Sequence, residues 1–139
     1  MLEKSFDLSK FANLTKDKIE KIAKESIIEL NENVAMTTPV DTGRLRYNWY
    51  PAINRYITTT SKNTDKTGIK VKAKIRGVMT KFKLGDTVTM TNALPYALRI
   101  EYTGHSRIKA PKGMVRINLA KFSQIVDKNV RKYRWMRLE

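Results

Sequence analysis

Few residues of the types that carry out catalysis occur in this sequence. His105 is the single histidine, and it lies in a basic loop beside Ser106 with no carboxylate near it in sequence. We therefore interpret His105 as a solvated loop residue. The chain has no cysteine, which removes thiolate nucleophiles, disulfides and most structural zinc sites. The remaining candidates are isolated turn carboxylates and widely spaced glycines, which build neither a Mg²⁺ cluster nor a phosphate-binding loop. We expect a non-enzymatic protein without metal or cofactor.

Positive charge is the strongest compositional feature. Lysine and arginine number 28 against 13 acidic residues, a formal net charge of +15. Such a field attracts polyanions and repels copies of the same chain. Residues 69–76 alternate apolar and basic side chains, which predicts a strand with one cationic face. The basic residues of this face are Lys70, Lys72, Lys74 and Arg76. The sequence leaves open whether the face is solvated, meets phosphates or meets an acidic protein partner.

Aromatic residues gather at two places that are candidate interfaces. Alternation along a strand places Trp49 and Tyr50 on opposite faces, so at least one of them should lie outside the core. Tyr133 and Trp135 stand among cations in a basic, aromatic tail over residues 131–139. Tryptophan and tyrosine dominate binding hot spots, so we expect the tail to dock on another subunit.

Hydrophobic periodicity predicts a single α+β domain over residues 1–139. Apolar residues at spacings of three and four indicate an N-terminal helix over 15–37 and a C-terminal helix over 114–130. Alternating segments between 47 and 91 favour an antiparallel β-meander, on which both helices should pack. A short helix is expected over 95–103. Residues 1–14 form an arm that docks on its own domain or on a neighbour. The longest apolar runs are far shorter than the ~20 residues of a membrane helix, and no signal peptide is expected.

Two short segments combine turn chemistry with charged residues. The first, TPVDTGRLR at residues 38–46, contains a proline that stops the preceding helix, and its glycine permits unusual dihedral angles. Local physics alone explains it as a connector between a helix and a strand. The second, PYALRIEYTG, lies at residues 95–104 and is followed by APKGMVR at 110–116.

Together these segments resemble a family of small proteins of tailed bacteriophages, called tail-completion, neck or minor tail proteins. The resemblance covers roughly residues 15–130. The first family motif is matched by Asp41, Thr42, Gly43, Leu45 and Arg46. The second is matched, with one extra residue before the glycine, by Tyr96, Ala97, Glu101 and Gly104. The strong basic bias and the aromatic start of the first strand depart from the family pattern.

The resemblance implies a structural virion protein at the head–tail junction, assembled in the host bacterial cytoplasm. Copies would form a ring that contacts the neighbouring connector and tail proteins and surrounds the channel DNA. A non-specific basic nucleic-acid-binding protein explains the charge equally well but not the paired motifs. A small nuclease explains little, because its catalytic groups are missing. Since no base-reading module is evident, any contact with DNA should be non-specific and weakened by salt.

Overall fold

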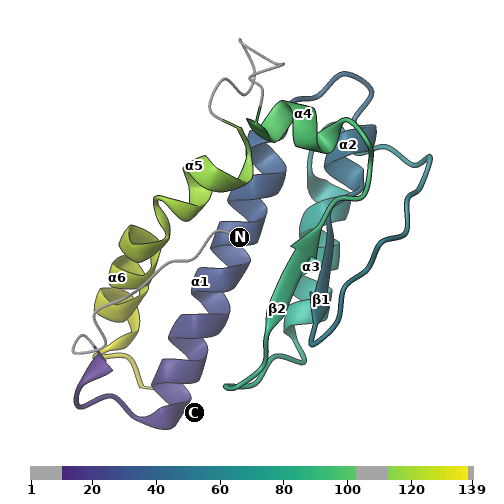
Figure 1. Ribbon diagram of the computed structural model, residues 1–139. Helices are drawn as coiled ribbons and strands as arrows, with labels where there is room; N and C mark the ends of the chain where they lie inside the picture. Colours follow the sequence, from purple (N-terminus) through teal and green to yellow (C-terminus); the bar gives the residue numbers. More distant parts are fainter. Residues whose placement is uncertain (1–10, 103–112, 138–139) are drawn as a thin grey trace.

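The computed structural model describes residues 11–102 and 113–137. They form an α+β fold in which a long N-terminal helix lies between two groups of elements (Figure 1). On one side lie two helices from the C-terminal part of the chain, and on the other lie a third helix and the sheet. In chain order the elements are α1 (Lys16–Thr37), α2 (Arg44–Tyr47), β1 (Tyr50–Ile53), α3 (Ile69–Met79), β2 (Val88–Thr91), α4 (Ala97–Tyr102), α5 (Val115–Leu119) and α6 (Phe122–Tyr133).

Helix α1 occupies the residues that its periodicity predicts. Thr15 is its N-cap, and the threonine hydroxyl accepts a hydrogen bond from the amide of Lys18 at 3.2 Å. The helix ends at Thr37, immediately before the residue that precedes Pro39, as expected for a position that disfavours helical dihedrals. Its buried line includes Ile22 at one end and Val34 at the other. The C-terminal helices on one side and α3 with the sheet on the other therefore both pack against α1.

The sheet is smaller than the predicted β-meander. Within the described residues it consists of β1 and β2, which pair antiparallel with Pro51 opposite Met90. Pro51 is tolerated because each strand of a two-stranded sheet is also an edge. The strand expected over residues 69–76 is absent, and α3 occupies that position instead.

Helix α3 forms because its start is capped and its apolar residues also fit a helical period. The Asp65 carboxylate accepts hydrogen bonds from the amides of Gly68 and Val71, both at 2.9 Å, which satisfies orphan donors of the first turn. Val71, Ile75 and Met79 recur every four residues and are fully buried. The predicted strand would place Ile69 on its apolar, core-facing side, but Ile69 is 72% exposed, so that expectation is wrong. Ala73 is exposed as well.

The predicted C-terminal helix is divided. A turn at residues 120–121 separates α5 from α6, and α6 continues beyond the predicted end to Tyr133. Val126, Val130 and Tyr133 pack with Ile22 in a small second core, against which Phe11 and Leu14 of the expected arm also pack. The short helix expected over 95–103 is present as α4. No helix among the described residues is long and apolar enough to span a membrane.

Candidate functional site

The turn of the first motif brings two distant loops into contact. Gly43 adopts φ +91°, and its carbonyl accepts a hydrogen bond from the amide of Asp65 at 2.9 Å. A Cβ atom at this position would lie 2.8 Å from the backbone of Asp65. Both the dihedral angle and the close approach therefore require glycine. Asp41 and Thr42 are exposed beside it, and the Thr42 hydroxyl accepts a hydrogen bond from the amide of Arg44.

Arg46 is the residue of the first motif with the largest number of polar side-chain contacts. Its guanidinium is buried and donates to the carbonyls of Ala35 (3.0 Å), Met36 (3.1 Å) and Thr38 (3.2 Å) at the end of α1. It also donates to the carbonyl of Lys66. The last carbonyls of a helix lack partners within the helix, so Arg46 satisfies them and ties them to the loop before α3. Burial lowers the pKa of Arg46, and the nearby Asp65 opposes that shift.

Trp49 belongs to the same buried assembly and not to an exposed interface. It is 4% exposed, and its indole Nε1 donates to the hydroxyl of Thr38 at 2.8 Å. That hydroxyl donates in turn to the carbonyl of Val34. Asn48 beside it is fully buried and exchanges hydrogen bonds with the backbone of Ser61. The expectation that Trp49 is an interface residue is contradicted by this burial. Leu45, between these residues and Gly43, is part of the core.

Glu101 of the second motif fixes the start of α5. Its carboxylate accepts hydrogen bonds from the amides of Met114 and Val115 at 2.7 Å, and from the amide and Nε of Arg116 at 3.0 Å. Burial by itself raises the pKa of Glu101. The hydrogen bonds from these amides and from the Arg116 side chain outweigh that effect and lower the pKa below its ordinary value. Gly113 approaches closely, because a Cβ there would lie 2.6 Å from the Glu101 carbonyl oxygen.

The other residues of the second motif have packing roles or lie outside the described residues. Ala97 is buried in the main core, and Tyr96 packs against it. Gly104 and His105, which we interpreted as a solvated loop residue, lie outside the described residues, as does the rest of the basic loop over residues 105–109. The sequence analysis did not predict the contacts that Asp65, Asn48 and Gly113 make. The usual signal for a helix start is absent here, because the N-cap of α3 is Gly68 and the capping carboxylate of Asp65 lies three residues before it.

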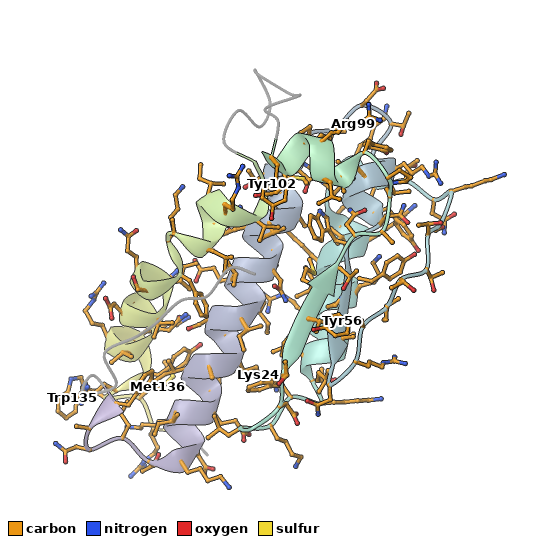
Figure 2. All side chains as sticks on the ribbon, in the orientation of Figure 1. Lys24, Tyr56, Arg99, Tyr102, Trp135 and Met136 are labelled. Carbon is orange, nitrogen blue, oxygen red and sulfur yellow. The ribbon has the colours of Figure 1, made fainter. Side chains whose placement is uncertain are left out.

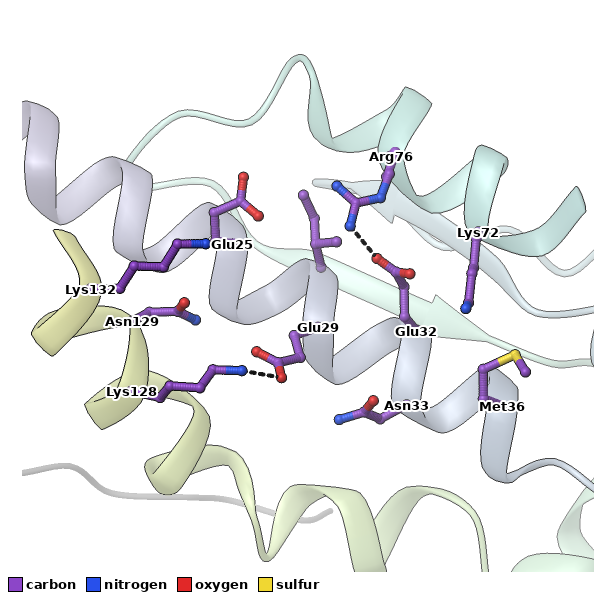
Figure 3. Close-up of a pocket in the computed structure, with 11 residues that line it drawn as sticks. Glu25, Glu29, Glu32, Asn33, Met36, Lys72, Arg76, Lys128, Asn129 and Lys132 are labelled. Atoms are coloured by element: carbon purple, nitrogen blue, oxygen red, sulfur yellow. Dashed lines mark hydrogen bonds and ion pairs between the residues drawn. The ribbon is translucent and has the colours of Figure 1, made fainter. Parts of the chain in front are cut away.

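The four predicted cations do not share one face, because they lie on a helix. Residues four apart neighbour one another on a helix, so Lys72 and Arg76 point to one side of the buried line and Lys70 and Lys74 to the other. Figure 3 shows Lys72 and Arg76 beside a cleft of about 480 Å³ between α1, α3 and α6. Acidic residues of α1 also line it, and two ion pairs cross it, Arg76 with Glu32 and Lys128 with Glu29. The cleft therefore carries mixed charge.

Lys74 is held by aromatic rings. Its Nζ lies 4.1 Å from the ring centroid of Tyr47 and 3.9 Å from that of Tyr50, and it donates to the Tyr47 carbonyl. Burial lowers the pKa of Lys74 to about 8, although nearby Asp65 opposes the shift. The half-buried Tyr50 is thus engaged within the subunit. Lys74 does not present a hydrated cation to an outside partner.

Large exposed apolar side chains lie at opposite ends of the molecule. Trp135 is 87% exposed and Met136 is 40% exposed just beyond α6. At the other end in Figure 2, Tyr102 of α4 is 57% exposed, and Leu98 of the same helix is 69% exposed. Tyr133 is 5% exposed and packs in the second core, so its predicted interface role is contradicted. Trp135 alone among the four aromatic candidates stands fully at the surface.

The described residues hold no group of three or more His, Cys, Asp or Glu side chains placed to bind a metal ion. Comparisons with protein-family models, curated proteins and solved structures found no match. The arrangement offers binding surfaces: two separated apolar ends, a mixed-charge cleft and abundant exposed cations.

Proposed function

We propose that this protein is a non-enzymatic structural component of the head–tail junction of a tailed bacteriophage, where copies form a ring between the connector and the tail. The observation that carries the proposal is the position of the motif residues. Gly43, Arg46 and Glu101 each join segments that are distant in the chain. The segments that resemble the phage family therefore coincide with the contacts that hold this architecture together, which supports a shared fold.

The surface supports a contact between different patches of successive subunits. A ring with more than two members needs a heterologous interface, in which one patch meets a different patch on the next copy. Trp135 at one end and Tyr102 at the other provide two such patches. The net charge of +15 opposes self-association, so the ring should form most readily against DNA or an acidic partner. The neighbouring connector and tail proteins are the proposed partners.

The alternative is a basic protein that binds nucleic acid without sequence preference, favoured by the same net charge. Co-purification with the proteins encoded beside it, followed by mass measurement of the complex, separates the two functions. The proposed function predicts a closed oligomer bound to connector or tail protein. Trp135→Ser should dissociate it, whereas Tyr56→Ser, a matched change at a side chain that is 74% exposed on a loop, should not. A protein that stays monomeric with these partners and binds duplex DNA with strong salt dependence would favour the alternative.

A further inference from the structure

An apolar groove runs along α1, with β2 on one side of it and α5 and the start of α6 on the other. It has a volume of about 340 Å³. Side chains from all these elements line it, including Leu30, Val34, Trp49, Met90 and Leu119. Val34, Trp49 and Val115 also take part in the hydrogen bonds described above. Those bonds use polar atoms, so the apolar walls of the groove call for a separate explanation.

One buried polar group also lines the groove. Asn31 of α1 is 5% exposed, and its Nδ2 has no hydrogen-bond partner within the part of the chain that the structure describes. A buried amide donor without an acceptor is unfavourable, and such groups in native proteins are normally paired. The groove therefore fits an occupant that presents apolar side chains together with a carbonyl oxygen. An extended peptide segment has both.

The described chain begins next to the groove. Phe11 lines a smaller apolar pocket of about 200 Å³ that shares Ile27 and Phe122 with the groove. Ten residues precede Phe11 in the sequence. Extended residues span about 3.3 Å each, so this segment can reach about 33 Å. The groove follows α1 from Ile27 to Val34, which is about 10 Å of helix, so the segment is long enough to cover it. Phe6 and Leu8 alternate with Ser5, Asp7 and Ser9, which is the pattern of an extended segment with one apolar face. Leu2 falls on the same face, as does Lys4 between them.

We propose that residues 2–8 bind in the apolar groove of their own chain, with Phe6 and Leu8 against its walls and the Asn31 amide donating to a backbone carbonyl of the segment. The short connection through Phe11 favours the segment of the same chain, because it holds that segment at a high effective concentration. The net charge of +15 disfavours a second copy as its source. The proposed docking covers an apolar groove within each subunit, and it does not depend on the proposed phage function.

Cross-linking tests the position of the segment directly, because the native chain contains no cysteine. The full-length variant Leu8→Cys/Leu119→Cys should react with a short bis-maleimide to give a link within one chain, identified by mass spectrometry. The matched variant Leu8→Cys/Lys62→Cys places its second thiol on an exposed loop and should not link. A link between two chains would overturn the proposal in favour of an exchanged segment. A yield no higher than that of the Lys62 variant would overturn docking altogether.

A second measurement tests the predicted apolar face. Phe6→Asp/Leu8→Asp should uncover the groove and raise the fluorescence of bound anilinonaphthalene sulfonate several-fold. Ser5→Asp/Ser9→Asp adds the same charge on the opposite face and should leave the fluorescence at the level of the unaltered protein. Equal dye binding by the two variants would contradict the assignment of Phe6 and Leu8 to the groove.

Discussion

Arg46→Ala is expected to lower the free energy of unfolding by about 1–3 kcal/mol, because the buried carbonyl of Thr38 at the end of α1 would lose the guanidinium as its donor. The bonds from Arg46 to the carbonyls of Ala35 and Thr38 are buried, and those to Met36 and Lys66 are partly buried. A buried acceptor left without a partner costs roughly 1–3 kcal/mol. This applies to the Thr38 carbonyl, because the Ala35 carbonyl keeps the hydrogen bond from the Thr38 amide at 3.3 Å. Water should replace the guanidinium at the two outer carbonyls, so they add little. Since domains of this size are stable by about 5–15 kcal/mol, the variant should still fold.

Urea denaturation followed by circular dichroism measures this loss as a shift in midpoint at constant slope. Arg55→Ala is the matched control, because Arg55 is an exposed arginine, and it should change the free energy by less than about 0.5 kcal/mol. Arg46→Lys should be intermediate, since an ammonium group keeps the charge but cannot reach the same carbonyls with a planar fork. Equal midpoints for Arg46→Ala and Arg55→Ala would refute the role of Arg46 in holding the end of α1.

Three further substitutions test particular contacts. Gly43→Ala should destabilise the fold by roughly 2 kcal/mol or more. The control Gly85→Ala should cost only about 1 kcal/mol, because Gly85 has a similar φ but open space around its Cβ position. Equal losses of stability in thermal denaturation would contradict the close approach of Gly43 to Asp65. Gly77→Ala should stabilise α3 by about 0.5–1 kcal/mol, since no atom obstructs the new methyl group, and a loss of stability would argue against the helix. The lowered pKa of Glu101 means that its ionised form stabilises the fold above about pH 4.5, the ordinary value, and that this contribution is lost as the pH falls through the folded-state pKa. The stability difference between the native protein and Glu101→Gln should therefore be largest near pH 7 and shrink in acid; a difference that is constant down to pH 3 would exclude the ionised carboxylate as its cause.

The helices with a single strong periodicity were predictable, whereas α3 was not. Residues 69–76 alternate strictly, so their sequence satisfies the strand period. Val71 and Ile75 also fit the helical period, and tertiary burial against α1 together with the Asp65 cap favours the helix. A strand places alternate side chains on one face, whereas a helix does not. Predicting a strand in place of α3 therefore also placed the four basic residues wrongly on one face. Instead of one cationic face, the helix has two pairs of basic residues with different surroundings, Lys72 with Arg76 and Lys70 with Lys74.

The motif residues were predictable as a set, but their contacts were not. The sequence indicated a turn at Gly43, yet the loop at Asp65 that forces the glycine is 22 positions away. Likewise, nothing local to Glu101 indicates that its carboxylate binds the amides at the start of α5. Tyr133 was missed as a core residue, although it extends the apolar line of Val126 and Val130 by three residues. Periodicity captures contacts along one helix, and it cannot identify which distant backbone groups a side chain will reach.

The most direct test of the proposed function is electron microscopy of particles made when this gene is deleted from its native genome. If the protein joins head to tail, DNA-filled heads and separate tails that fail to join should accumulate. Joining should be restored by the unaltered gene supplied in trans and not by Trp135→Ser. Complete, infectious virions in the absence of the gene would contradict a role in joining head to tail.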